Sequence, residues 1–499
     1  MNGAIMVELD AVSRFLNIAS LHPYAPAVVE EGQVFSYKEL ELLVRKFAFR
    51  FSKKNKPKVL IALPQGVDAY AVMLAAGLAG GFYVPVNVAS PADKLGRIIN
   101  QVEPDFVVCN AEMNSVLMTY FQSFVGIDAS YPRNSVPQLF GYGDRHELAY
   151  VMFTSGSTGL PKGVMIPRTG LNHYVNWLGE ELRISQGDRL SQHPNIAFDL
   201  SVFDIYGALC FGGSLYPLID RVDKLMPARF IKRYSISIWN SVPSVMSLMI
   251  QANQVKAEFL ESVRLFSFCG EPLLQQHVEP LFHACPQAIV QNTYGPTEAT
   301  VSMTQIRLSS DDFSEACRSS VALGDPIKDM AIHLMGGHSD SEGEIVITGP
   351  QLSSGYWGDA KKTNEVFKEI NINGKAERSY YTGDWAERIN GYLFFKDRID
   401  FQVKVNGYRI ELDEVLAAIN NCGWPIASVI KYRDGLAALI EVGDRVPFDA
   451  SKLRAALGEH IDQHAIPKII CSTEKIPRNE NDKIDRRAVY SWLEAHETL

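Results

Sequence analysis

The sequence contains few cysteines, and their positions exclude two classes of small, cross-linked protein. Seven cysteines are spread over 499 residues, and no two of them form a C-x-x-C pair. Disulfide scaffolds and structural zinc sites require paired, regularly spaced cysteines. The sequence therefore predicts neither of them, and the scattered thiols favour a reducing compartment, the cytoplasm.

Long apolar segments and an excess of basic residues are lacking as well. Residues 1–15 have neither the basic start nor the apolar core of a signal peptide. Residues 69–86 carry no charge, but Gly80, Gly81 and Pro85 interrupt them. We therefore interpret this segment as a buried helix followed by a strand rather than as a membrane span. A formal net charge of −9 argues against nucleic acid or a membrane as a partner.

The remaining composition is that of a globular protein with more than one core. Hydrophobic residues make up 46% of the chain and charged residues 21%, which is ordinary for globular domains. Short apolar runs at 59–63, 106–109 and 148–153 alternate with amphipathic stretches. This pattern predicts an α/β fold with a large N-terminal domain of layered sheets over residues 1–399. A strand–helix alternation of its own follows and predicts a small α+β domain over residues 400–499.

Residues 154–163, TSGSTGLPKG, are the most informative segment of the chain. Their glycines allow the backbone to approach a ligand closely, and their N–H groups, hydroxyls and Lys162 can bind phosphate oxygens. The segment is not a Walker loop, because Gly163 stands where that pattern requires Ser or Thr after the lysine. Composition alone does not distinguish it from a polar surface loop.

This segment resembles the phosphate loop of the adenylate-forming superfamily, which includes acyl-CoA synthetases, luciferases and the adenylation domains of non-ribosomal peptide synthetases. Further motifs stand in the family's order: FSYKEL (35–40), LAGGFYVPVN (78–87), FDLSVFDIYGAL (198–209), NTYGPTEAT (292–300), GEIVITGPQLSSGYW (343–357), YYTGDWA (380–386), KDRIDFQVKVNGYRIE (396–411) and NENDKIDR (479–486). So many motifs in one order do not arise by chance. The resemblance covers residues 25–490.

The resemblance implies that a carboxylate attacks the α-phosphorus of ATP, releases pyrophosphate and leaves an acyl-adenylate. Lys483 would be catalytic by stabilising charge on the α-phosphate, and Glu298 would help to hold Mg²⁺. Tyr294 would stack on adenine, and Asp384 would bind the ribose hydroxyls. The full set implied for ATP is Thr154, Ser155, Gly156, Ser157, Thr158, Gly159, Lys162, Gly270, Glu271, Asn292, Thr293, Tyr294, Gly295, Thr297, Asp384 and Arg398.

The resemblance also implies that the C-terminal domain is mobile and rotates between two half-reactions. Asp400 corresponds to the hinge residue, and Gly407 would leave room in the tunnel for a phosphopantetheine thiol. Asp482 and Asp397 stand where the family usually has glycine. Asp482 places a negative charge beside the catalytic lysine.

The motif FDLSV (198–202) indicates which acid is activated. In amino-acid-activating members, an aspartate at the position of Asp199 pairs with the α-ammonium, which needs a fixed carboxylate once it is desolvated. The implied substrate pocket consists of Phe198, Asp199, Leu200, Phe203, Asn240, Ser267, Cys269, Thr293, Val301 and Ser302. These side chains resemble pockets for alanine or another small residue. Serine, cysteine, glycine and proline stay open, and so does chirality.

The acceptor of the activated acid is expected to be a separate carrier protein. LMGGHSDS (334–341) resembles a phosphopantetheine attachment site, but a carrier domain would need a helical bundle of its own, and too few residues follow the last motif. The phrase FSFCGEPL (266–273) resembles D-alanine:D-alanyl carrier protein ligases. We therefore predict a free-standing amino acid:carrier-protein ligase that uses ATP and Mg²⁺.

Two alternatives share the same motifs. One is an acyl- or aryl-CoA synthetase, against which Asp199 argues, since such enzymes generally lack an acid at this position. The other is a luciferase-like oxygenase or an inactive paralogue. Retention of Lys162, Glu298, Asp384 and Lys483 argues against inactivity.

Overall fold

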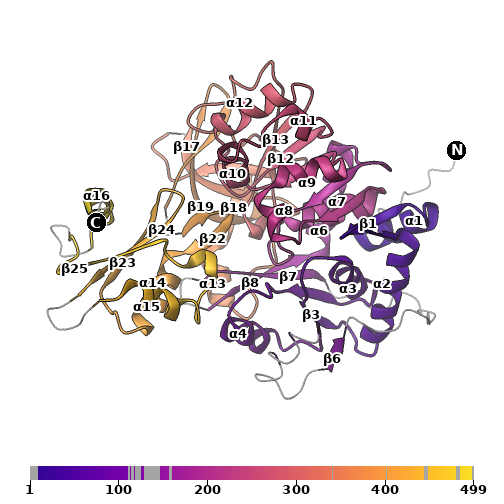
Figure 1. Ribbon diagram of the computed structural model, residues 1–499, viewed down its shortest axis with the longest axis horizontal. Coiled ribbons are helices and arrows are strands. Elements are labelled where there is room, and N and C mark those ends of the chain that lie inside the picture. The colour runs from indigo at the N-terminus through magenta and orange to yellow at the C-terminus, as the bar shows by residue number, and fades with distance from the viewer. Residues whose placement is uncertain are drawn as a thin grey trace. The chain divides into compact units, whose positions relative to one another are not determined.

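The structure is a computed structural model (Figure 1) that describes residues 9–110, 113, 117, 125–128, 147–156, 160–339, 341–399, 402–442, 448–478 and 484–496. The chain divides into two compact units. The large unit comprises Met1–Val88, Val102–Met152 and Gly163–Asp397, and the small unit comprises Ala89–Gln101, Phe153–Lys162 and Arg398–Leu499. The domain boundary between residues 399 and 400 stays a prediction, and the hinge residue Asp400 lies outside the described residues.

Two large, mainly parallel sheets form the framework of the large unit. The first has the strand order β6-β5-β3-β4-β7-β8, with β3 (Lys58–Ala62), β4 (Phe82–Pro85), β5 (Phe106–Cys109), β6 (Val125–Asp128), β7 (Leu148–Thr154) and β8 (Lys162–Pro167). The second has the order β15-β14-β13-β12-β11-β9-β10-β1-β2. Its strands are β1 (Pro26–Glu30), β2 (Gln33–Ser36), β9 (Arg189–Gln192), β10 (Ser214–Pro217), β11 (Ile238–Ser241), β12 (Leu265–Phe268), β13 (Ile289–Tyr294), β14 (Thr304–Leu308) and β15 (Asp325–Pro326).

Helices pack on both of these sheets and on one another. The large unit contains α1 (Ala11–Leu21), α2 (Tyr37–Phe51), α3 (Val67–Leu78), α6 (Arg168–Leu182), α7 (Ser201–Phe211), α8 (Arg221–Leu225), α9 (Pro227–Tyr234), α10 (Pro243–Gln251), α11 (Ala257–Leu260), α12 (Gln275–Ala284), η1 (Thr297–Ala299) and α13 (Ala360–Val366). Helix α3 packs on β3 and β4, α7 packs on β9 and β10, and α1 contacts both helices. Helices α3 and α7 are apolar on nearly all sides and buried over nearly their whole length, because each is enclosed by sheet and neighbouring helices.

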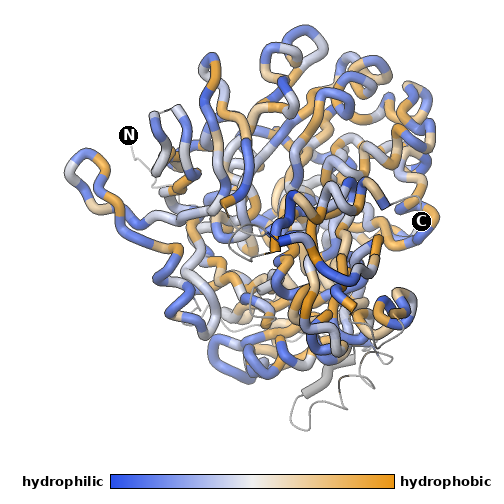
Figure 2. Tube along the Cα trace, turned by 90° about the vertical axis from the view of Figure 1, so that its left-hand side faces the viewer, coloured by the Kyte–Doolittle hydropathy of each residue, from blue (hydrophilic) through white to orange (hydrophobic). Residues whose placement is uncertain are grey.

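The uncharged segment 69–86 is a buried helix followed by a strand, as predicted. It spans most of α3 and all of β4, which are buried nearly throughout. Among the helices in the described part of the chain, none is both long and apolar enough to cross a bilayer. Figure 2 shows that hydrophobic residues concentrate within helices and strands, whereas many outlying loops are hydrophilic.

A third, mainly antiparallel sheet completes the large unit. It consists of β16 (Ala331–Met335), β17 (Glu342–Thr348), β18 (Phe367–Ile372), β19 (Lys375–Ile389) and β20 (Tyr392–Arg398). The phosphopantetheine-like motif at 334–341, of which residue 340 lies outside the described residues, begins at the end of β16 and ends directly before β17, its antiparallel partner. It is therefore a hairpin connection, in agreement with its rejection as a carrier attachment site.

The small unit is an α+β body. A hairpin of β21 (Gln402–Val405) and β22 (Tyr408–Glu411) accompanies a three-stranded sheet of β23 (Ala427–Tyr432), β24 (Gly435–Glu441) and β25 (Ile469–Thr473). Its helical segments are α4 (Ala92–Val102), α14 (Leu412–Asn421), α15 (Ala450–Leu457), η2 (Gln463–Ala465) and α16 (Arg486–His496). Helices α14 and α16 pack on β23. The predicted fold class, layered α/β sheets with a small α+β part, is confirmed.

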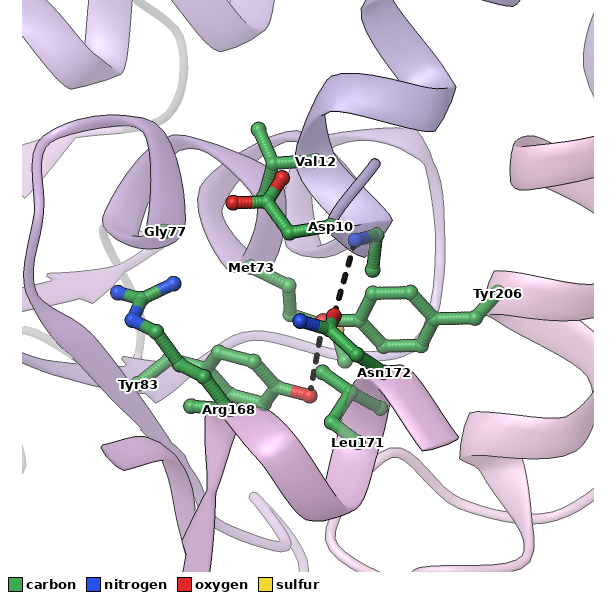
Figure 3. A pocket seen from close by; sticks show the side chains of 11 residues that line it. Asp10, Val12, Met73, Gly77, Tyr83, Arg168, Leu171, Asn172 and Tyr206 are labelled. Atoms are coloured by element: carbon green, nitrogen blue, oxygen red, sulfur yellow. Dashed lines mark hydrogen bonds between the residues drawn. The ribbon is translucent and has the colours of Figure 1, made fainter. Parts of the chain in front are cut away.

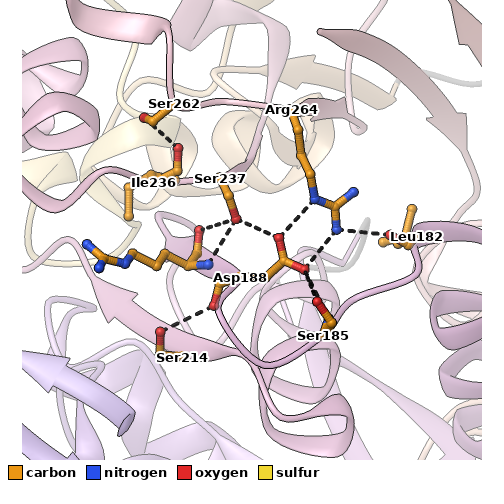
Figure 4. Close-up of polar contacts among 9 residues, drawn as sticks. Leu182, Ser185, Asp188, Ser214, Ile236, Ser237, Ser262 and Arg264 are labelled. Carbon is orange, nitrogen blue, oxygen red and sulfur yellow. Dashed lines mark hydrogen bonds and ion pairs between the residues drawn. The ribbon is translucent and has the colours of Figure 1, made fainter.

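A polar cluster fixes the amino-terminal ends of three parallel strands (Figure 4). Asp188 directly precedes β9, Ser237 precedes β11 and Arg264 precedes β12. The Asp188 carboxylate accepts hydrogen bonds from Arg264 Nε at 2.9 Å and Nη2 at 3.0 Å, and from Ser237 Oγ at 2.8 Å. Burial raises the pKa of Asp188, but the hydrogen bonds from Arg264, Ser185 and Ser237 outweigh burial and lower it.

Asp188→Asn should lower the free energy of unfolding at pH 7 by about 1–2 kcal/mol, because it removes charge-assisted bonds to a partly exposed arginine. The stabilisation is present above the unfolded-state pKa of about 3.9 and is lost as the pH falls through the lower folded-state pKa. Chemical denaturation at several pH values measures the difference. Asp325→Asn, at an exposed position in β15, is the control, and equal losses in both variants would contradict the role of the cluster.

Candidate functional site

The carboxyl ends of parallel strands carry several residues predicted to line the substrate pocket. Asn240 lies in β11, Ser267 in β12 and Thr293 in β13. In the parallel register Asn240 pairs with Ser267, which pairs in turn with Gln291 on β13. Ligands of open α/β sheets bind outside the carboxyl ends of the strands. This edge of the second sheet is therefore the expected place for a small-molecule site.

The turn that leads into α7 carries the predicted ammonium anchor, Asp199. The Phe198 N–H donates to the Asn195 carbonyl oxygen at 2.9 Å, and the Val202 N–H donates to the Asp199 carbonyl oxygen at 2.9 Å. These bonds hold the backbone of the turn, and Asp199 is only 6% exposed. A carboxylate at this depth is suited to bind a desolvated ammonium group.

The segment after η1 has a strained backbone and contacts another predicted pocket residue. Thr300 and Val301 have φ angles of 55° and 71°, which β-branched residues rarely adopt. Gly295 permits this path, since a Cβ there would lie 2.5 Å from the Cα of Ser302. The Cys269 thiol donates to the Val301 carbonyl oxygen at 4.0 Å. The structure thus brings Cys269, Gly295, Val301 and Ser302 together.

The predicted pocket residues are enclosed by the protein. Buried members are Asp199, Leu200, Phe203, Asn240, Ser267, Cys269, Thr293, Val301 and Ser302, and Phe198 is half-buried. Asn240 Nδ2 donates to the Leu200 carbonyl oxygen at 3.4 Å, which joins β11 to the start of α7. These side chains therefore lie in the interior of the large unit.

Two residues predicted to bind the nucleoside contact each other directly. The Tyr294 hydroxyl, at the end of β13, donates to Asp384 Oδ2 in β19 at 2.6 Å. The Asp384 N–H donates to Thr382 Oγ1 at 2.9 Å, and Asp384 is buried. A residue of the second sheet and a residue of the third sheet therefore meet, as a site for one nucleoside requires.

The remaining predicted nucleotide residues of the large unit have structural partners of their own. Asn292 Nδ2 donates to the Ala322 carbonyl oxygen at 2.9 Å. Glu271 Oε2 accepts from the Ser244 N–H at 2.9 Å at the start of α10, a position that favours a carboxylate. Gly270 has a φ of 95°, which suits glycine, and Thr297 is buried at the start of η1.

Glu298 is held by a segment that follows β17. Its carboxylate is fully buried, and Oε1 accepts a hydrogen bond from the Tyr356 hydroxyl at 2.7 Å. The Ser353 N–H donates to the Glu298 carbonyl oxygen at 2.7 Å. The same segment pairs with β8, because Trp357 N–H donates to the Gly163 carbonyl oxygen at 2.7 Å. Tyr356 therefore links Glu298 to the strand that leaves the phosphate loop.

The Glu298 carboxylate is a ligand of the kind that Mg²⁺ takes from proteins. Within the described residues, no group of three or more histidine, cysteine, aspartate or glutamate side chains forms a metal site. Mg²⁺ is commonly held by one or two carboxylates together with waters and substrate phosphates. A single buried carboxylate such as Glu298 is compatible with that mode of binding.

In the small unit, the described part of the phosphate loop contacts β22. Lys162 Nζ lies 2.5 Å from Glu411 Oε1, and both side chains are largely buried. Ser155 Oγ donates to the Arg409 carbonyl oxygen at 2.6 Å. Gly156 allows the loop to close, because a Cβ there would lie 1.9 Å from the Leu160 carbonyl oxygen. The lysine that the sequence predicts to bind phosphate thus forms an ion pair with a carboxylate of the protein.

Arg398 and Gly407 also belong to the small unit. Arg398 Nη2 donates to Gln402 Oε1 at 2.8 Å, and Gln402 Nε2 donates to Glu411 Oε1 at 2.5 Å. Gly407 has a φ of 81° and forms, with Asn406, the turn between β21 and β22. An Asn-Gly pair with two positive φ angles is the preferred two-residue hairpin turn.

Several predicted residues lie outside the described residues: Ser157, Thr158 and Gly159 of the phosphate loop, Asp400 and Lys483. Their roles stay predictions, as does the effect of Asp482. Asp397 is exposed within β20. An extended backbone accepts any residue, so an aspartate fits at this position where the family usually has glycine.

Sequence reasoning missed Tyr356, Asp204 and Glu411. Tyr356 lies in the predicted motif 343–357, and Asp204 lies in the motif 198–209, but neither was assigned a role. A tyrosine between glycine and tryptophan, and a second aspartate in an otherwise apolar helix, are the signals that could have found them.

A separate small cavity lies among α1, α3, α6 and α7 (Figure 3). Its lining includes Asp10, Arg168 and Asn172. The Ala11 N–H donates to Asn172 Oδ1 at 3.1 Å, and Tyr206 OH donates to Tyr83 OH at 3.3 Å. None of the residues predicted for ATP or substrate lines this cavity, so it is distinct from the candidate site.

Comparison with known proteins agrees with this geometry. The family model described as AMP-binding enzyme matches residues 15–357. A D-alanine–D-alanyl carrier protein ligase of Listeria monocytogenes serotype 4b (strain F2365) is 31% identical over 98% of this chain and 99% of its own. The protein of the same name from Bacillus licheniformis is 32% identical over 94% of this chain and 96% of its own.

Solved structures include a similar fold. The crystal structure of the Vibrio cholerae adenylation domain AlmE in complex with glycyl-adenosine-5'-phosphate has a TM-score of 0.86 and 25% sequence identity. The similarity covers 99% of this chain and 100% of that one. The likeness therefore extends over both units.

Tyr356→Phe should lower the free energy of unfolding by about 1–3 kcal/mol, because the buried Glu298 carboxylate loses a hydrogen bond. Chemical denaturation measures the change. Tyr392→Phe, at a half-buried position in β20, is the matched control and should stay within about 0.5 kcal/mol of the wild type. A Tyr356→Phe variant as stable as the control would show that the bond does not hold Glu298.

Proposed function

Because this chain belongs to the family of AMP-binding enzymes, we propose that it activates a small α-amino acid with ATP and transfers it to the thiol of a separate carrier protein. Membership confirms the resemblance to adenylate-forming enzymes and the expectation of an ATP-dependent, AMP-forming ligase. The observation that carries the choice of substrate is the buried Asp199 carboxylate at the start of α7. The names of the similar carrier-protein ligases favour alanine, in its D form.

In the first half-reaction, the amino acid's carboxylate attacks the α-phosphorus of ATP. Two anions must approach each other, so the protein has to neutralise charge and hold the reactants in line. Asp199 holds the α-ammonium, Asp384 binds the ribose, and Tyr294 stacks on adenine once ATP separates it from Asp384. Lys483 stabilises the charge that develops on the α-phosphate.

Glu298 is the residue that would hold Mg²⁺, which supplies neutralisation of phosphate charge when it is bound. The hydrogen bond from Tyr356 fixes one carboxylate oxygen. Because the same segment pairs with β8 at Gly163 and Val164, Glu298 is connected to the strand that follows the phosphate loop. This link supports a metal site that acts on the phosphates of ATP.

In the second half-reaction, the thiol of the carrier's phosphopantetheine attacks the aminoacyl-adenylate and releases AMP. Rotation about Asp400 removes Lys483 and presents the segment that contains Gly407. The contact between Lys162 and Glu411 in the small unit supports this step. A phosphate loop engaged by a carboxylate is suited to the stage after pyrophosphate has left.

Glycine is a second candidate substrate, since the structurally similar adenylation domain was solved with glycyl-adenosine-5'-phosphate. Acyl- and aryl-CoA synthetase activity is not favoured, because a buried carboxylate would face an uncharged part of such a substrate.

The test of the proposed function is amino-acid-dependent ATP–pyrophosphate exchange with D- and L-alanine, glycine, D- and L-serine, an aryl acid and a fatty acid. We expect exchange with alanine, faster for the D form, and a dependence on Mg²⁺. Exchange only with acids that lack an amino group would overturn the proposal. A second assay, transfer of the radiolabelled amino acid to a phosphopantetheinylated D-alanyl carrier protein, tests the second half-reaction.

Asp199→Asn should reduce kcat/KM for alanine about 30-fold or more, because a substrate ammonium loses its buried ionic partner. Propionate, which lacks the ammonium, should be activated by wild type and variant at similarly low rates. Asp325→Asn is the control for a surface charge. If alanine and propionate decline equally in Asp199→Asn, the carboxylate does not act as the anchor.

A further inference from the structure

A second carboxyl group, Asp204, lies behind the wall of the proposed amino-acid pocket. It is located in the first turn of α7 and is 0% exposed, as is Asn240 on β11. Asn240 Nδ2 donates to Asp204 Oδ2 at 3.3 Å and to the Leu200 carbonyl oxygen at 3.4 Å. The two side chains therefore already share one hydrogen bond in a site closed to solvent.

The orientation of the Asn240 amide follows from these contacts. A backbone carbonyl only accepts hydrogen bonds, so the group that faces Leu200 must be Nδ2. The two hydrogens of Nδ2 then point to Leu200 and to Asp204. Asn240 Oδ1 consequently lies on the other arm of the amide, as an acceptor that needs a donor.

Two oxygen atoms of this pair lack a partner. Among the residues that the structure describes, Asp204 Oδ1 and Asn240 Oδ1 are buried and have no hydrogen-bond partner. Buried polar atoms are nearly always satisfied, and each exception requires an explanation. If Asp204 were ionised, both unsatisfied atoms would be oxygen acceptors and could not bond to each other, whereas a proton on Asp204 makes one of them a donor.

The surroundings of Asp204 disfavour a charge. Burial raises the pKa of Asp204 well above its usual range, against a smaller lowering effect of Asn240. Asp204 acts on the phenols of Tyr70 and Tyr174, whose pKa values are raised first by burial and further by neighbouring acids. Both phenols are therefore neutral. The N-terminus of α7 favours an anion, but this effect is smaller than the cost of burying an unpaired carboxylate.

We propose that Asp204 is protonated at neutral pH and donates from Oδ1 to Asn240 Oδ1, so that acid and amide form a cyclic pair with two hydrogen bonds. This arrangement satisfies both orphaned oxygens at once. It fixes Asn240, the pocket-wall residue, against Leu200 at the start of α7. Asp204 is thus a positioning residue, which acts on the substrate through Asn240.

A neutral Asp204 also has a consequence for charge in the pocket. An α-amino acid brings one ammonium group, and Asp199 supplies one carboxylate to pair with it. A second carboxylate behind Asn240 would compete for the same ammonium and draw it away from the anchor. The proton on Asp204 therefore keeps Asp199 as the carboxylate that binds the substrate.

The kinetic test compares Asp204→Asn with Asp204→Leu. An asparagine at 204 can form the same cyclic pair with Asn240, amide to amide, so we expect its alanine KM to stay within about threefold of the wild type. A leucine at position 204 cannot pair with Asn240, so the alanine KM of Asp204→Leu should rise at least about fivefold. Asp199→Asn is the matched control for loss of a true anion. If Asp204→Asn raises the KM as much as Asp199→Asn does, Asp204 is an anion and the proposal fails.

Infrared spectroscopy tests the proton directly, without any need for activity. At pH 7 the wild-type protein should show the carbonyl band of a neutral carboxylic acid that shifts on ¹³C-aspartate labelling. The band should persist in Asp199→Asn and vanish in Asp204→Asn. Absence of an aspartate band in the wild type overturns the proposal, even if the Asp204 variants do not fold.

The kinetic arm rests on the proposed function, whereas the infrared arm does not. If no amino acid supports exchange but the aspartate band is present, the proposed function fails and the Asp204–Asn240 pair stands. If alanine supports exchange and the band is absent, the proposed function stands and the pair fails.

Discussion

The register of the parallel strands in the second sheet is the constraint on which the candidate site depends. Asp188 joins the starts of β9, β11 and β12 through Ser237 and Arg264. With the starts of the strands fixed, Asn240 and Ser267 reach the opposite edge at the same level. A shift of one residue would turn these side chains to the other face of the sheet. Polar bonds at one edge therefore determine the geometry of the pocket at the other edge.

The sequence was most informative where a short motif or a helix-breaking residue marks a definite point of the fold. Tyr294 and Asp384 were predicted to bind the same nucleoside. The structure places the Tyr294 hydroxyl 2.6 Å from Asp384 Oδ2, although the two residues belong to different sheets. The segment 69–86 could be identified as a buried helix and strand, because glycines and proline interrupt it. In both cases a short stretch of sequence carries the information, through family motifs in the first case and through the residues that interrupt a helix in the second.

Other features could not be predicted, because they depend on pairings between distant segments. The bond between Tyr356 and Glu298, and that between Asn240 and Asp204, join residues that lie far apart in the chain. No periodicity or spacing encodes such a contact. The strained φ angles of Thr300 and Val301 are likewise imposed by packing, since neither residue type prefers that conformation. The sequence predicts which residues line the pocket, whereas their hydrogen-bond partners are seen only in the tertiary structure.

The ion pair of Lys162 with Glu411 changes how phosphate binding responds to salt. A lysine exposed to solvent attracts phosphate over a distance comparable to the Debye length, and dissolved ions weaken that attraction. In the small unit, the Lys162 charge is already neutralised at 2.5 Å by a largely buried carboxylate. A phosphate that binds there replaces one anion with another and leaves the local charge balance almost unchanged. If Lys162 binds phosphate as proposed, we expect that binding to depend on the competition between two anions more than on the ionic strength of the solution.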